Sequence, residues 1–84
     1  MHAIVGHWST DAALDEDQLS HIVETVRGQE GFVRGYWGQE PGDPHLAHSF
    51  LIFETLAAAR GMADAVRAAI PSASVRVIAV LADA

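Results

Sequence analysis

The sequence predicts an α+β domain in which two helices cover one face of a four-stranded antiparallel sheet. Three observations predict this arrangement. Four segments alternate with the two-residue period of strands, two segments repeat apolar residues at helical spacing, and turn residues separate the segments from one another. The chain has 84 residues, so we expect a single domain spanning residues 1–84.

The first two elements are a strand and a helix. Alternation from Ala3 to Trp8 predicts a strand, and because neither of its sides is wholly polar, we expect it in the centre of the sheet. Asp15 is a plausible N-cap, with Gln18 completing part of a capping box. A helix over 15–28 follows, with an apolar stripe at helical spacing: Leu19, Ile22, Val23 and Val26.

The middle of the chain predicts a hairpin. The segment Gly31 to Gly38 alternates as a strand and holds three of the six Phe, Tyr and Trp residues. The run from Gln39 to His45 is rich in Pro and Gly, so we expect it to form a loop. Leu46 to Glu54 is the next strand. Because the loop between the two strands is short, they are expected to pair antiparallel.

The last two elements are again a helix and a strand. Thr55 can cap a helix that begins at Leu56 and ends before Pro71, and Val75 to Leu81 predicts the final strand. The element order is therefore βαββαβ. Right-handed crossovers turn this order into a ferredoxin-like sandwich.

The composition excludes several functional classes. The formal net charge is −6 and there is no Lys, which argues against nucleic-acid binding and against anionic membrane surfaces. No apolar run approaches the roughly 20 residues of a membrane span, and the N-terminus does not resemble a signal peptide. The absence of Cys removes thiolate catalysis and Cys-based metal sites and fits a cytoplasmic protein.

The last two strands are apolar on both faces, although the helices can cover only one. Leaving four such side chains in water forfeits roughly 6–12 kcal/mol, at roughly 1.5–3 kcal/mol each. The whole free energy of unfolding of a small domain is about 5–15 kcal/mol, so this loss would remove much of its stability. We therefore expect a homodimer packed sheet to sheet. The alternative is that a ligand or another protein covers this face.

The face away from the helices is the first candidate site. An unpaired charge is very costly to bury, so Arg34 and Arg76 are expected on this face, and His7 and His48 are assigned to it by a weaker form of the same argument. An apolar hollow with a few polar groups is typical of a small-ligand pocket, while Arg and Tyr also anchor protein interfaces. The residues favour neither interpretation over the other. The expected set is His7, Phe32, Arg34, Tyr36, His48, Phe50, Ile52, Arg76, Ile78 and Val80.

Other motifs give weaker signals. His45 and His48 are three residues apart, which on a strand sends their rings to opposite faces, so no metal site is expected. Trp8 and Trp37 end their strands and could frame a ligand, although large aromatic residues are more often simply packed. The glycines form no phosphate-binding loop, and no serine lies in a hydrolase motif.

Three segments carry a resemblance to a known family. Gly31 to Trp37 looks like a Pro-Gly-led second strand, with Glu30 in place of the proline. Phe50 to Thr55, followed by an alanine-rich helix, is similar to a strand that ends in a Trp-Glu-Ser-like triplet, with Phe53 and Thr55 as departures. The third is the final short strand. Together they resemble the antibiotic-biosynthesis-monooxygenase-like branch of the dimeric α/β barrels.

The resemblance implies a homodimer whose sheets form a barrel, with a cleft between sheet and helices in each protomer. Characterised relatives include cofactor-independent oxygenases of polycyclic aromatics and haem-degrading enzymes. The haem-degrading members use an Asn-Trp-His set, which cannot be carried over because this sequence contains no Asn. In the oxygenases, Trp, Tyr and Arg matter around the substrate.

Two functions follow from these expectations. The first is a cofactor-independent monooxygenase acting on a small aromatic or polyketide-like substrate, with His7, Arg34 and His48 in catalysis. The second is a non-catalytic dimeric module that binds a small ligand or has a structural role. No cofactor is expected in either. The expected substrate-binding residues are Trp8, Phe32, Tyr36, Trp37, Phe50 and Arg76.

Overall fold

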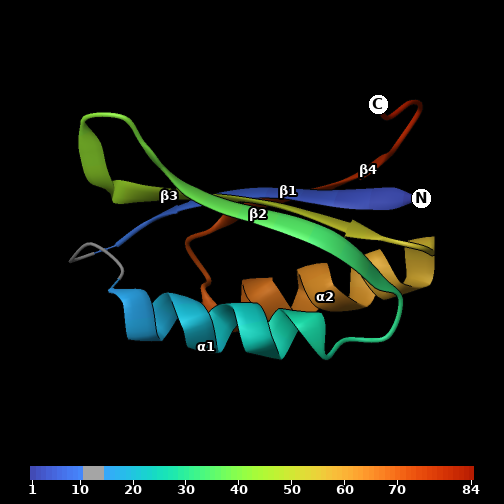
Figure 1. Cartoon of the computed structure of the whole chain (residues 1–84), viewed down its shortest axis with the longest axis horizontal. Coiled ribbons are helices and arrows are strands. Elements are labelled where there is room, and N and C mark those ends of the chain that lie inside the picture. The colour runs from blue at the N-terminus through green and yellow to red at the C-terminus, as the bar shows by residue number, and fades with distance from the viewer. Residues whose placement is uncertain (11–14) are drawn as a thin grey trace.

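Four antiparallel strands form one sheet in the order β2-β3-β1-β4, and two helices lie against one of its faces (Figure 1). The computed structural model describes residues 1–10 and 15–84. This is the predicted α+β ferredoxin-like βαββαβ fold. Its elements are β1 (His2–Ser9), α1 (Glu16–Arg27), β2 (Phe32–Glu40), β3 (Asp43–Phe53), α2 (Leu56–Ala69) and β4 (Ser74–Ala79).

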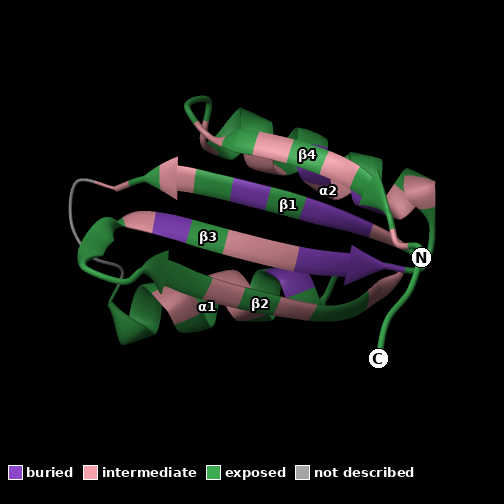
Figure 2. Cartoon of the chain, turned by 90° about the horizontal axis from the view of Figure 1, so that it is seen from above, coloured by how far each residue is buried: buried purple, intermediate pink, exposed green. Residues whose placement is uncertain are grey.

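The two helices lie under different parts of the sheet. α1 lies beneath β2, and α2 packs against β4, β1 and β3 (Figure 2). β1 is a central strand, as predicted, and pairs with β3 on one side and β4 on the other. The opposite face of the sheet carries no helix, and we call it the helix-free face.

Both helices begin at the predicted capping residues. The backbone N–H of Gln18 donates to Asp15 Oδ1 at 2.7 Å, and Gln18 Oε1 accepts from the Asp15 backbone N–H at 3.2 Å. This is the complete capping box. At α2, Thr55 Oγ1 accepts from the N–H of Ala58 at 3.1 Å. Each cap satisfies a backbone donor that the helix itself leaves free.

The core lies between the sheet and the helices. Phe53 and Ile4 are its largest fully buried side chains. From α2, Ala59 and Ala63 are fully buried, and their small side chains let that helix approach the sheet closely. α1 contributes less, with Val26 as its only buried residue among those described.

The hairpin between β2 and β3 is tighter than predicted. The expected loop over Gln39 to His45 is wrong, because β2 continues to Glu40 and β3 already begins at Asp43. Only Pro41 and Gly42 form the turn, and Gly42 has φ 84°. Pro followed by a positive-φ Gly is the type II pattern. The turn-forming composition is explained by this turn and by the irregular pairing near it.

A β-bulge changes the predicted face of Phe32. Phe32 pairs with Phe53, but Arg34 already pairs with Ile52, so Val33 is an extra residue without a partner. Simple alternation placed Phe32 beside Arg34 on the helix-free face, and that prediction is wrong. The ring of Phe32 packs against the core, 5.7 Å from the Phe53 ring in an edge-to-face arrangement.

The end of the last strand also differs from the prediction. β4 stops at Ala79, so Leu81 is not a strand residue and is 96% exposed. Val80 follows the strand, and its N–H donates to the carbonyl of Met1 at 3.0 Å. Within residues 1–10 and 15–84, no helix combines the length and apolar character that a membrane crossing requires.

Candidate functional site

A cleft of about 310 Å³ lies between the sheet and the two helices, and we call it the main chamber. Its size is at the lower end of the about 300–1,000 Å³ typical of small-molecule sites. The sheet supplies its floor, while α1 and α2 supply its walls. The lining residues are Trp8, His21, Ile22, Thr25, Val26, Trp37, Ser49, Leu51, Met62, Ala65, Val66, Ala69 and Ile70.

Small side chains on the floor leave room for the main chamber. Across the sheet, Trp37 pairs with Ser49, Ser49 with Gly6, and Gly6 with Val75, so these four residues form one row on the helix side. Ser49 and Gly6, in the middle of the row, carry almost no side-chain volume, and Ser49 and Trp37 line the main chamber. In the next row toward Phe53, Leu51 and Ile4 fill the corresponding space and form the core.

The indole of Trp37 lies over Gly35. A Cβ atom at residue 35 would lie 2.9 Å from Trp37 Cη2 and 2.9 Å from Leu51 Cδ2, closer than real side chains approach. The missing side chain at Gly35 therefore leaves room for the indole next to the strand backbone. Both tryptophans of the chain, Trp8 and Trp37, line the main chamber.

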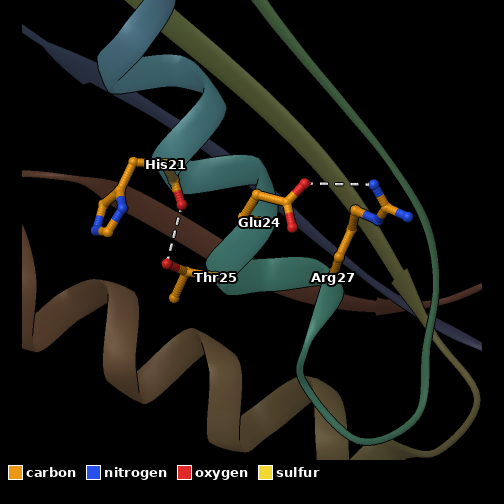
Figure 3. Close-up of polar contacts among 4 residues, drawn as sticks. All are labelled: His21, Glu24, Thr25 and Arg27. Atoms are coloured by element: carbon orange, nitrogen blue, oxygen red, sulfur yellow. Dashed lines mark hydrogen bonds and ion pairs between the residues drawn. The ribbon is translucent and has the colours of Figure 1, made fainter.

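Within the part of the chain that the structure describes, the main chamber has few polar side chains, and none of them carries a fixed charge. Thr25 and His21 lie on the flank of α1 nearer α2, away from the Glu24–Arg27 pair (Figure 3). Thr25 Oγ1 donates to the carbonyl of His21 at 2.9 Å. Ser49 is the only hydroxyl among the lining residues of the floor. No Arg or Lys lies among the described residues that line the main chamber, so a ligand there meets no fixed positive charge.

The helix-free face holds a second, wider hollow of about 380 Å³, whose lining includes Val5, His7, Tyr36, His48 and Phe50. It is more open to solvent than the main chamber, and Tyr36 is 61% exposed. A single chain offers this surface as a shallow depression. A ligand bound there would keep much of its own surface in water.

Two histidines meet on the helix-free face. His7 and His48 occupy paired positions on β1 and β3, and their ring centroids are 5.9 Å apart. His48 Nε2 lies 3.0 Å from Glu40 Oε2. No group of three or more metal-ligating side chains occurs within the described ranges.

The sheet separates the predicted site residues into two groups. The register places Arg34 and Arg76 on the same face as His7 and His48. Arg34 pairs with Ile52, which shares a face of β3 with His48, and Arg76 pairs with Val5, which shares a face of β1 with His7. On the helix-free face are His7, Arg34, Tyr36, His48, Phe50 and Arg76. On the helix side are Trp8, Phe32 and Trp37.

Sequence reasoning missed several residues of the main chamber. Ser49 was not singled out as a site residue, and neither was His21. His21 is exposed, but it also lines the main chamber. One signal in the sequence was the presence of small residues on a strand face that is otherwise apolar. Where large side chains are absent from such a face, the space that they would occupy must be filled by something else.

The comparisons with known proteins do not identify a family. No protein-family model matches the chain, and no curated protein matches it. The family resemblance therefore stays a prediction.

Proposed function

We propose that this chain binds a small, neutral, aromatic or polyketide-like molecule in the main chamber. The observation that carries the proposal is that both tryptophans line one apolar cleft between sheet and helices, from the two strands, β1 and β2, that flank β3. Tryptophan rings present large faces against which a planar ligand can stack. A pocket of this size and apolar character, with a few polar groups, is typical of small-ligand sites.

The charge distribution supports a neutral ligand. An anionic ligand in an apolar cleft needs a cationic partner, because a buried unpaired charge is costly. Arg34 and Arg76 lie across the sheet on the helix-free face. Arg67 on α2 is bonded to Asp64 and to the carbonyl of Val75. The net charge of −6 further disfavours anions.

Calorimetric titration with two naphthalene probes tests the proposal. 2-Naphthol, which is neutral at pH 7, should bind, and 2-naphthoate should bind at least about ten-fold more weakly, which corresponds to about 1.4 kcal/mol. Equal binding of the two probes would contradict a neutral site.

Two adjacent residues provide a matched pair of variants for the location of the site. Trp37 lines the main chamber, whereas Tyr36 points to the helix-free face. Trp37→Ala should weaken 2-naphthol binding at least about ten-fold, and Tyr36→Ala should leave it unchanged. The reverse result would place the ligand on the helix-free face and overturn the proposal.

The second candidate function is cofactor-independent monooxygenation in the same cleft, as the family resemblance implies. The observation that favours it is His21, the only titratable side chain among the described residues that line the main chamber. A histidine can remove a proton from a substrate methylene whose carbanion is stabilised by conjugation with a carbonyl. Molecular oxygen would then oxidise that carbon to a carbonyl, with one oxygen atom retained and the other released as water.

Oxygen uptake with anthrone as substrate tests this second candidate. The expected stoichiometry is one O₂ consumed for each anthraquinone and water formed. His21→Gln should slow uptake, while His7→Gln, across the sheet, should not. No uptake above the uncatalysed rate would leave ligand binding as the function. Selective loss in His7→Gln would instead favour the catalytic set predicted from the sequence.

We further infer a homodimer formed through the helix-free face, in a cytoplasmic setting that the cysteine-free composition fits. Val5, Tyr36 and Ile78 are apolar or aromatic side chains on that face that are 38%, 61% and 41% exposed. Covering them would recover part of the hydrophobic free energy that a single chain forgoes. Sedimentation of the wild-type chain and of Ile78→Asp should show a dimer and a monomer, respectively. A wild-type monomer at micromolar concentration would refute the inference.

A further inference from the structure

A smaller cavity adjoins the main chamber at the turn end of the β2–β3 hairpin, and we call it the annex. Its volume is about 180 Å³. Leu19 of α1 forms one wall, while Ala47 of β3 and Pro44 form another. Gln39 supplies a polar side chain on the helix side of the sheet, since it pairs with the buried Ala47, and His48 also borders the annex.

The annex and the main chamber meet at the two tryptophans. Trp8 and Trp37 line both cavities. Trp8 and Ala47 are paired positions in the sheet, so the annex continues the same floor one row beyond Ser49. At about 180 Å³ the annex is smaller than the about 300–1,000 Å³ of typical independent sites. Its size and position suit a substituent of a ligand whose main body lies elsewhere.

We propose that the ligand has two parts, with a fused-ring body in the main chamber and one smaller apolar ring in the annex. The bond joining them passes between Trp8 and Trp37. This inference rests on the proposed binding function and adds the shape of the ligand to it. A neutral hydrogen-bonding group on the far side of the smaller ring would meet the Gln39 amide, and no Arg or Lys occurs among the described residues that line the annex.

Calorimetry with a compact and an extended probe tests the inference on the full chain. The compact probe is 2-naphthol and the extended probe is 6-phenyl-2-naphthol. The additional phenyl ring should increase affinity at least ten-fold in the wild type. If 2-naphthol binds and the phenyl ring adds nothing, the annex proposal fails while the proposed function stands. If neither probe binds, both fail.

Two alanine-to-leucine variants separate the cavities. Ala47 lines only the annex and Ala65 lines only the main chamber. Ala47→Leu should abolish the ten-fold gain of the extended probe and leave 2-naphthol binding unchanged. Ala65→Leu should weaken both probes by the same factor.

A second annex variant is needed in case a leucine at the buried Ala47 position impairs folding. Leu19 lies on the opposite wall and is only partly buried, so Leu19→Trp fills the annex from α1. It should also remove the gain of the extended probe. If the extended probe keeps its ten-fold advantage in folded Leu19→Trp and Ala47→Leu, the annex is not where the phenyl ring lies and the proposal is overturned.

Discussion

The indole of Trp37 and the backbone of Gly35 are in such close contact that a side chain at residue 35 would force its neighbours to move. A Cβ there would lie 2.9 Å from the ring and 2.9 Å from Leu51. This contact places the indole between the main chamber and the annex, because Trp37 lines both. A glycine two residues before a tryptophan on one strand face therefore shapes the candidate site.

Gly35→Ala should destabilise the chain and move the indole. Overpacking of a filled core costs about 1–3 kcal/mol, and this is the expected loss in free energy of unfolding. Urea denaturation followed by tryptophan fluorescence measures both effects. Gly38→Ala is the matched control on the same strand, because nothing lies within 4 Å of a Cβ placed there. Equal effects of the two substitutions would contradict the contact.

Gly61→Ala should stabilise the chain. Gly61 lies inside α2, nothing occupies the space of its missing Cβ within 4 Å, and Ala is favoured over Gly in a helix interior by about 0.5–1 kcal/mol. The midpoint of urea denaturation should rise without a change in slope. A fall in the midpoint would mean that the Gly61 position is more crowded than the structure shows.

The β-bulge at Val33 predicts that alanine substitutions at two neighbouring residues differ in their cost to stability. Phe32→Ala should cost about 2–4 kcal/mol, somewhat less than the about 3–5 kcal/mol of a fully buried Phe, because Phe32 is only half-buried. Val33→Ala should cost less than about 1 kcal/mol, since Val33 is exposed. Thermal or urea unfolding measures both. If the two costs are similar, the bulge is misplaced.

Asp15→Ala should weaken the start of α1 by about 1 kcal/mol, because the Gln18 N–H would lose its side-chain acceptor. Asp15→Asn keeps an oxygen acceptor and loses only the interaction of the charge with the helix dipole. The Asn variant should therefore unfold at a higher temperature than the Ala variant. The same unfolding temperature for both would show that the hydrogen bond contributes nothing.

Most of the fold followed from local sequence signals. The caps at Asp15 and Thr55 and the alternation in β1 each mark an element through interactions between residues near in sequence. The bulge at Val33 did not, because whether a strand contains an extra residue depends on its partner strand. The loop between β2 and β3 was predicted to be too long for a related reason. Asp43 and Pro44 are typical turn residues, but here they lie at the start of β3.

The candidate site was only partly predictable. Trp8 and Trp37 were singled out because large aromatic residues are conspicuous in a sequence. Their relation to Ser49 and Gly6 depends on the register of three strands, which no local pattern specifies. The cost of burying an unpaired charge led to the prediction that the site lies on the helix-free face. That expectation placed Arg34 correctly, but the more enclosed apolar cleft lies on the other side of the sheet.

Ligand binding on the helix side of the sheet can be followed residue by residue by NMR of the isotope-labelled chain titrated with 2-naphthol. Indole N–H signals of Trp8 and Trp37 and the backbone amides of Thr25 and Val66, which line the main chamber, should shift with one common saturation curve. Shifts centred instead on His7, Tyr36 and Arg76, with the two indole signals unmoved, would contradict binding on the helix side.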